Sequence, residues 1–104
     1  MSIQRFIHFE FRDDFSSHDA ATFEDIVGRW PAAMPWLLGV RCGRPYWTKP
    51  SRSRVGYVLD LEFEDQTAFD RYTEHPAHLE LRDFLSGHAY DVQIFDLEYG
   101  PPWR

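Results

Sequence analysis

The sequence has very little cysteine and no long apolar run. Its one cysteine, Cys42, excludes an intrachain disulfide and any metal site built from several cysteines. The first residues contain no apolar stretch of signal-peptide length, and no stretch of the chain is apolar enough to cross a bilayer. We therefore expect a soluble protein in a reducing compartment, the cytoplasm.

Positive charge is also scarce. The chain has 17 Asp and Glu against 11 Lys and Arg, which gives a formal net charge of −6. An acidic protein repels phosphate groups, so we expect neither nucleic acid nor a membrane surface as a partner. The sequence lacks a Gly-rich phosphate loop and the Gly-x-Ser-x-Gly turn of many hydrolases. Its length of 104 residues suits a single domain, which we expect to span residues 1–104.

Aromatic residues, in contrast, are abundant. Nine Phe, five Tyr and four Trp make up 17% of the chain. Such side chains usually fill a core, an interface or an apolar ligand pocket. The composition is therefore compatible with a packed dimer and with a protein that binds a small apolar or aromatic ligand.

The apolar pattern predicts an α+β fold. Strands are expected at residues 3–11, 37–42, 55–63 and 92–99. Four apolar residues recur at helical spacing: Phe23, Ile26, Val27 and Trp30. We expect Pro31 to end that helix, Asp65 to cap a short second helix and Pro76 to begin a third. This order is typical of a ferredoxin-like four-stranded antiparallel sheet with helices on one face.

The other face of such a sheet would be bare. The alternation places Phe6, Val58 and Ile94 on that face among polar neighbours. A second copy of the chain could cover this apolar surface. We therefore expect a homodimer in which two sheets pack face to face.

The most specific motif of the chain is Tyr72-Thr-Glu-His75-Pro-Ala-His78, which follows Glu62-Phe-Glu-Asp65. Weaker motifs lie at residues 5–14, 34–37, 43, 56–57 and 95–96. In these segments the chain resembles the stress-responsive α/β-barrel domain family over nearly its whole length. The resemblance implies a ferredoxin-like sheet that dimerises into an α/β barrel. Most members of that family have no assigned reaction.

One branch of the family, similar to olivetolic acid cyclase, closes a linear polyketide by aldol condensation without metal or cofactor. Its catalytic tyrosine and histidine correspond to Tyr72 and His78. Arg5 stands where that branch has a pocket histidine. The resemblance therefore implies cofactor-free acid–base chemistry by Tyr72 and His78.

The residues themselves also point to His78. It shares a predicted helical stripe with Leu81 and Phe84, so it should face inward. An imidazole, with a pKa of about 6.5, can act as an acid or a base near neutrality. Tyr72 lies across the Pro76 turn and could orient His78 or stabilise an oxyanion. A purely structural histidine–tyrosine hydrogen bond remains the alternative.

The expected ligand pocket lies between the sheet and the helices. Its candidate binding residues are Arg5, Ile7, Phe23, Val27, Leu59, Leu81 and Trp47. Arg5 could hold a substrate carboxylate or enolate, or it could reach solvent or an acid such as Glu98. Residues 41–54 contain five basic residues around Trp47, so they could form a lid over an anionic aromatic ligand or simply a soluble loop.

The other histidines near the motif are expected to be structural. His75 precedes Pro76 and should help to shape the turn. His88 lies near the end of the predicted helix, where an imidazole suits the helix dipole. Because Pro76 separates His75 from His78 and no third ligand is evident, we expect no metal.

Together these patterns predict a small-molecule-binding dimeric α/β-barrel protein without a cofactor. The enzymatic hypothesis is histidine–tyrosine acid–base catalysis on an aromatic or polyketide-like substrate, in a cyclase, isomerase or lyase reaction. Two alternatives remain open. One is a non-enzymatic stress-responsive or structural protein, and the other is a carrier of an aromatic metabolite.

Overall fold

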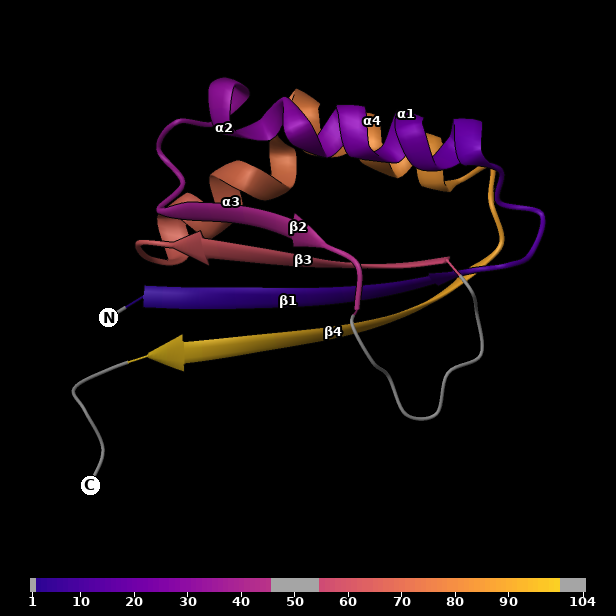
Figure 1. The fold of residues 1–104 in the computed structure, drawn as a ribbon. Helices are drawn as coiled ribbons and strands as arrows, with labels where there is room; N and C mark the ends of the chain where they lie inside the picture. Colours follow the sequence, from indigo (N-terminus) through magenta and orange to yellow (C-terminus); the bar gives the residue numbers. More distant parts are fainter. Residues whose placement is uncertain (1, 46–54, 100–104) are drawn as a thin grey trace.

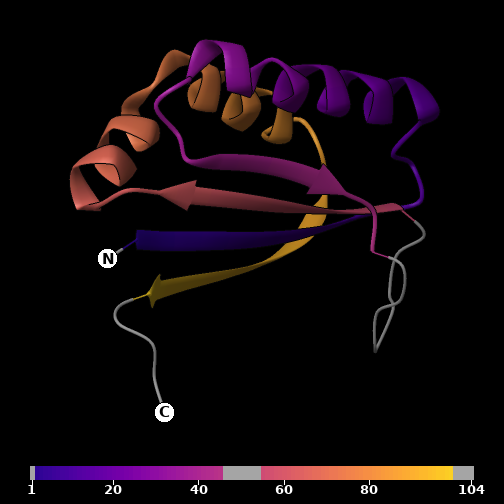
Figure 2. The same ribbon diagram turned by 60° about the vertical axis from the view of Figure 1, so that its left-hand side comes forward.

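The computed structural model describes residues 2–45 and 55–99. In chain order their elements are β1 (Ser2–Phe11), α1 (Ser17–Gly28), α2 (Trp30–Ala33), β2 (Gly39–Gly43), β3 (Val55–Phe63), α3 (Gln66–Glu74), α4 (Pro76–Leu85) and β4 (Tyr90–Tyr99). Figures 1 and 2 show the helices together on one side of the sheet. α1 and α4 lie side by side, and α3 lies over the end of the sheet where β1 begins.

The four strands form one antiparallel sheet in the order β2-β3-β1-β4. β1 is central, and its Arg5 lies opposite Leu61 of β3 and Asp96 of β4. With helices between β1 and β2 and between β3 and β4, this is the ferredoxin-like arrangement. The predicted fold class is confirmed.

The space between sheet and helices is filled by large apolar side chains. The largest fully buried ones are Trp30, Tyr57, Tyr72, Phe11, Phe23, Phe63, Met34, Leu59 and Leu61. Burying one such side chain stabilises the fold by about 1.5–3 kcal/mol relative to leaving it exposed. Much of the aromatic content therefore serves the core of a small domain.

The first helical segment differs from the prediction at its end. The Ser16 hydroxyl accepts a hydrogen bond from the Asp19 amide at 3.0 Å, and the Asp19 carboxylate accepts one from the Ser16 amide at 2.9 Å. This capping box starts α1. The expectation that Pro31 ends the helix is wrong, because α1 already ends at Gly28 and Pro31 lies in the first turn of α2. Proline is tolerated there because a first-turn amide has no acceptor within the helix.

The sheet face away from the helices carries exposed apolar side chains, but the prediction for Ile94 is wrong. Ile94 lies opposite Ile7, so it points to the helix side. Phe95 and Leu97, which are 58% and 43% exposed, share the open face with Phe6 instead. Since β4 carries apolar residues at both alternating sets of positions, the pattern alone did not separate its two faces.

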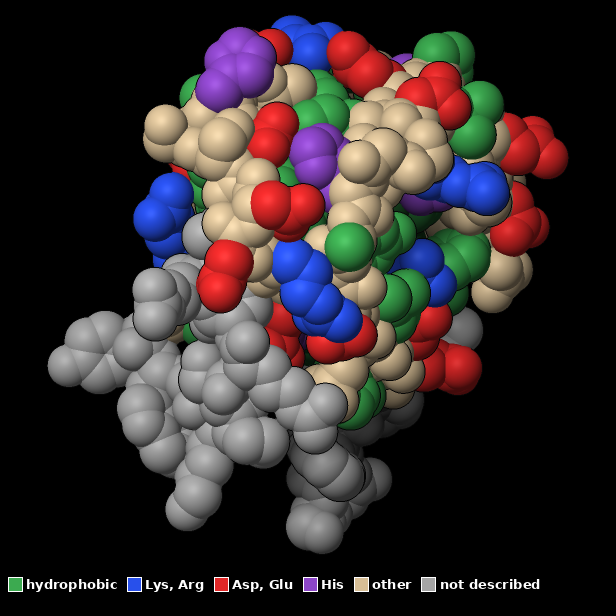
Figure 3. All heavy atoms as spheres, turned by 90° about the vertical axis from the view of Figure 1, so that its right-hand side faces the viewer, with side chains coloured by type: hydrophobic (Ala, Val, Ile, Leu, Met, Phe, Trp, Pro, Cys, Tyr) green, Lys and Arg blue, Asp and Glu red, His purple; other side chains and the backbone are tan. Residues whose placement is uncertain are grey.

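Among the described residues, no helix is both long and apolar enough to cross a membrane. Figure 3 shows acidic side chains scattered among basic and hydrophobic ones on one face of the molecule. The expected cytoplasmic location and the expected lack of a nucleic-acid partner stay predictions.

Candidate functional site

The junction of α3 and α4 is shaped by His75. The Asp65 carboxylate caps the start of α3 by accepting from the Ala68 amide at 2.9 Å. α3 ends at Glu74, and His75 is both its C-cap and the N-cap of α4. The His75 Nδ1 accepts a hydrogen bond from the Ala77 amide at 3.1 Å, so the ring fixes the turn as predicted.

This turn brings Tyr72 and His78 together. Their ring centroids are 4.4 Å apart, with an angle of 41° between the ring planes. Tyr72 is only 1% exposed, whereas His78 is half-buried. Trp30 packs against both rings, with centroid distances of 5.6 Å to Tyr72 and 6.3 Å to His78. The two candidate catalytic residues thus share one aromatic cluster.

The hydrogen bond of His78 defines which ring nitrogen can act as a base. Its Nδ1 lies 3.0 Å from the carbonyl oxygen of Thr73. Because a carbonyl oxygen can only accept, Nδ1 carries the proton and Nε2 is the basic nitrogen of the neutral ring. Burial lowers the pKa of His78 below its ordinary value of 6.5; the hydrogen bond to Thr73 opposes this shift, and the charges of Arg82 and Arg5 add to it. The ring is therefore mainly neutral at pH 7.

Tyr72 does not orient His78 through a hydrogen bond. Within residues 2–45 and 55–99, its hydroxyl has no hydrogen-bond partner, and the Thr73 carbonyl holds the imidazole instead. Burial raises the pKa of Tyr72, so the phenol stays protonated at neutral pH. An uncharged, unpaired O–H group is thus a donor for an oxygen atom placed beside it.

Arg5 is held by an acid of the neighbouring strand. Its Nε and Nη2 donate to the two carboxylate oxygens of Asp96 at 2.7 and 2.8 Å, and its guanidinium lies 4.6 Å from the ring centroid of Phe69. These hydrogen bonds raise the pKa of Arg5 and lower the pKa of Asp96. The alternative that Arg5 reaches an acid is therefore confirmed, but the acid is Asp96 rather than Glu98, which lies opposite Ile3, two positions along the strand.

Most of the predicted pocket lining is packed core. Five of the candidate binding residues are between 0 and 5% exposed: Ile7, Phe23, Val27, Leu59 and Leu81. Trp47 lies outside the described residues, as does most of the suggested lid. A hollow of about 330 Å³ is lined by Phe69 and Asp96, beside the Arg5 pair, and another of about 310 Å³ lies between α1 and β2. His78 lines neither of these two hollows.

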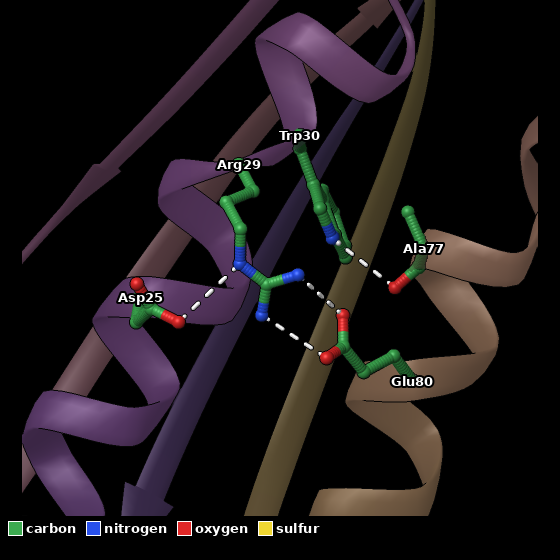
Figure 4. Close-up of polar contacts among 5 residues, drawn as sticks. All are labelled: Asp25, Arg29, Trp30, Ala77 and Glu80. Carbon is green, nitrogen blue, oxygen red and sulfur yellow. Dashed lines mark hydrogen bonds and ion pairs between the residues drawn. The ribbon is translucent and has the colours of Figure 1, made fainter.

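A polar network ties the end of α1 to the first turns of α4. Arg29 donates to Glu80 through two nitrogens at 3.0 Å each and to Asp25 at 3.3 Å. Beside it, the Trp30 indole donates to the Ala77 carbonyl at 3.2 Å, as Figure 4 shows. Because Ala77 directly precedes His78, these contacts help to set where the imidazole lies.

The remaining sequence predictions concern His88 and metal binding. His88 packs on Phe15 and Phe84, with ring centroids 5.1 and 4.6 Å away, and its Nε2 is 4.0 Å from Asp19, in keeping with a structural role. Among the described residues, no three His, Cys, Asp or Glu side chains are grouped as metal ligands would be.

Comparison with known proteins identifies the family. The family model described as the stress-responsive A/B barrel domain matches residues 3–99. The chain belongs to this family. No curated protein sequence matches this A/B barrel domain.

Solved structures share the fold of this A/B barrel domain. A dimeric ferredoxin-like protein of unknown function from Thermobifida fusca is 16% identical, with a TM-score of 0.79 over 95% of this chain and 92% of that chain. A dimeric protein of unknown function from Bacteroides fragilis is 19% identical, with a TM-score of 0.74 over 94% and 96%. Hydroxynitrile lyase from Passiflora edulis is 13% identical, with a TM-score of 0.74 over 98% and 97%. Similarity at these identities shows the fold alone.

Proposed function

We propose that this A/B barrel domain binds a small apolar or aromatic ligand and acts on it by cofactor-free acid–base catalysis. In this proposal His78 is the base and Tyr72 is the hydrogen-bond donor to the developing oxyanion. The observation that carries the proposal is the pair itself: the Thr73 carbonyl fixes the tautomer of His78, and the adjacent Tyr72 hydroxyl is protonated and unpaired within the described residues.

The pair suits proton abstraction next to a carbonyl group. The Nε2 atom of His78 takes a proton from the carbon, and the electron pair of the C–H bond moves to the carbonyl oxygen as an enolate. The Tyr72 O–H donates a hydrogen bond to that oxygen, which lowers the energy of the charged intermediate. The enolate carbon can then attack a second carbonyl, and His78 returns its proton to the new alkoxide. Such a sequence fits a cyclase, and its reverse fits a lyase.

Two comparisons lend support without deciding the reaction. One support is the sequence resemblance to the cyclase branch, whose catalytic tyrosine and histidine would correspond to Tyr72 and His78. The hydroxynitrile lyase of Passiflora edulis shows that this fold can carry lyase chemistry. In this chain the branch histidine is replaced by Arg5, whose guanidinium is bound to Asp96. The substrate should therefore differ from that of the cyclase.

The base function of His78 can be tested without the natural substrate. The probe is 4-phenylbutan-2-one in D₂O, with exchange of the protons beside its carbonyl followed by NMR. We expect the protein to exceed an equal concentration of free imidazole by about tenfold or more, since a positioned base typically contributes 10²–10⁴-fold. His78→Ala should fall to the background rate, and the matched variant His88→Ala should keep the activity. Equal rates for the protein and His78→Ala would refute the assignment.

The packed interior favours one alternative. Because the five apolar candidates are buried and His78 lines neither of the two hollows, a non-enzymatic structural protein is the second candidate. A carrier would bind the aromatic ketone without speeding its exchange. A structural protein would neither bind it nor exchange it, and in that case Tyr72 and His78 would matter only for stability.

We also propose that the domain forms a homodimer through the open face of the sheet. Phe95 and Leu97 are large exposed apolar residues beside Phe6 on that face, and the Thermobifida fusca and Bacteroides fragilis proteins of this fold are dimeric. Light scattering should give twice the mass of one chain. Phe95→Asp should give monomers, because it would bury an unpaired charge in the interface. A monomeric unmodified protein would contradict the proposal.

A further inference from the structure

The hollow between α1 and β2 has a polar end and an apolar remainder. Its volume of about 310 Å³ falls at the lower end of the range of small-molecule sites. Val27 and Pro31 line it from the helix side, and Val40 and Cys42 line it from β2. Val40 and Cys42 pair with Leu61 and Leu59, which are fully buried, so both point to the helix side of the sheet.

Three polar side chains meet at the end of this hollow. The Tyr57 hydroxyl donates to the Glu24 carboxylate, and Arg44 Nη2 donates to the Tyr57 hydroxyl at 3.2 Å. The same Arg44 nitrogen lies 3.5 Å from Glu24. Tyr57 is 2% exposed and its ring stacks on Phe23 with centroids 4.5 Å apart, so the phenol is a rigid support for the arginine.

Within the part of the chain that the structure describes, this cluster uses only the Nη2 atom of the Arg44 guanidinium for hydrogen bonds. Among the described residues, the Nε and Nη1 atoms of Arg44 have no hydrogen-bond partner, and its side chain is 64% exposed. A guanidinium presents its nitrogen donors in a planar fork that matches the two oxygens of a carboxylate. An exposed ion pair such as that between Arg44 and Glu24 contributes little to stability, so stabilising the fold is a weak explanation for this arrangement.

We propose that this hollow is a second ligand site, which binds a small carboxylic acid with one aromatic ring. Arg44 Nε and Nη1 bind the carboxylate, and the ring lies on the apolar surface of Val27, Pro31 and Val40. Tyr57 and Glu24 position the guanidinium from behind. The net charge of −6 disfavours anions at most of the surface, so this arginine selects for the acid group locally.

The site is separate from Tyr72 and His78 and does not depend on the proposed reaction. Tyr57 lies four residues along β3 from Leu61, which pairs with Arg5 beside the candidate catalytic cluster. At about 3.3 Å per residue the two positions are about 13 Å apart along the strand. None of the three residues Arg5, Tyr72 and His78 lines this hollow.

The single cysteine of the chain provides an assay, because Cys42 lines the hollow. The experiment uses the full chain and follows alkylation of Cys42 by iodoacetamide with intact-mass spectrometry. The probes are benzoate and phenylacetate, each at up to about 10 mM, since ligands of this size bind in about the millimolar range. Benzyl alcohol is the matched neutral probe. Amide NMR shifts of Gly28 and Gly43, which also line the hollow, provide a second readout.

Either acid should slow alkylation by about threefold or more and shift the Gly28 and Gly43 amides, and benzyl alcohol should do neither at the same concentration. Arg44→Gln should abolish the protection. Arg41→Gln removes the same charge from β2 on the opposite face of the sheet and should keep the protection, as should His78→Ala. The proposal is overturned if neither acid protects or shifts the amides. It is also overturned if benzyl alcohol protects Cys42 as well as the acids do. A third contrary result is that the acids protect Cys42 in Arg44→Gln as well as in the unmodified protein.

Discussion

Replacing Trp30 by phenylalanine tests how the aromatic cluster supports both the fold and the candidate site. Trp30 is fully buried, and its indole donates to the Ala77 carbonyl at 3.2 Å. The substitution removes that hydrogen bond, worth about 1 kcal/mol. It also removes about three ring atoms from a packed position, which should lower the free energy of unfolding by about 2 kcal/mol more. We expect the free energy of unfolding to fall by about 3 kcal/mol.

Urea unfolding followed by circular dichroism measures this loss, and the melting temperature should fall by about 10 °C or more. The matched control is Trp36→Phe. Trp36 is only half-buried and lies 4.3 Å from the guanidinium carbon of Arg71, so its replacement should cost less than about 1.5 kcal/mol. In Trp30→Phe the imidazole resonances of His78 should also shift, because Ala77 precedes His78. A loss for Trp30→Phe below about 1 kcal/mol, or one no larger than that of the control, would refute the reasoning.

Three further outcomes follow from the structure. The pKa of His78 is lowered in the folded protein, so the unfolded chain binds more protons near pH 6. The contribution of His78 to the free energy of unfolding is therefore fully present above about pH 6.5 and is lost as the pH falls. His78→Gln should therefore reduce the loss of stability between about pH 8 and pH 5 in urea titrations, and an unchanged pH dependence would contradict the assigned shift. Tyr72→Phe removes a hydroxyl without a partner among the described residues, so the free energy of unfolding should change by less than about 0.5 kcal/mol. A loss above about 1.5 kcal/mol would show that the hydroxyl is structural. Ser16→Ala breaks the capping box of α1 and should lower the free energy of unfolding by about 1 kcal/mol, as measured by thermal unfolding. The control Ser17→Ala, one residue inside the helix, should have little effect. Equal losses in the two variants would argue against the cap.

Local patterns predicted the elements that depend on local rules. Residues 55–63 alternate clearly, and their inward set of Tyr57, Leu59, Leu61 and Phe63 is buried as the alternation requires. The turn around Pro76 was also predictable, since a proline can start a helix and the residue before it is held extended; His75 indeed has a ψ of 138°. The proximity of Tyr72 and His78 follows from that turn.

The Glu24, Tyr57 and Arg44 cluster had no signal in the sequence. Its members are 13 to 33 residues apart and come from a helix, a strand and the residue after β2. Each residue looks ordinary in its own segment: an acid on a helix, an aromatic on the buried face of a strand, a cation in a loop. Only the packing of α1 against the sheet puts them in contact.

The alternation of β3, the Asp65 cap and the turn at His75 and Pro76 were predictable from residues close together in the chain, and the motifs around them indicated the family. These depend on neighbours within a few residues, where backbone geometry links residue type to conformation directly. Only the folded protein shows that Arg5 binds Asp96, that Ile94 faces the helices and that the predicted pocket lining is mostly packed core. Strand register and side-chain packing set these features, and both depend on contacts between segments that lie far apart in the chain.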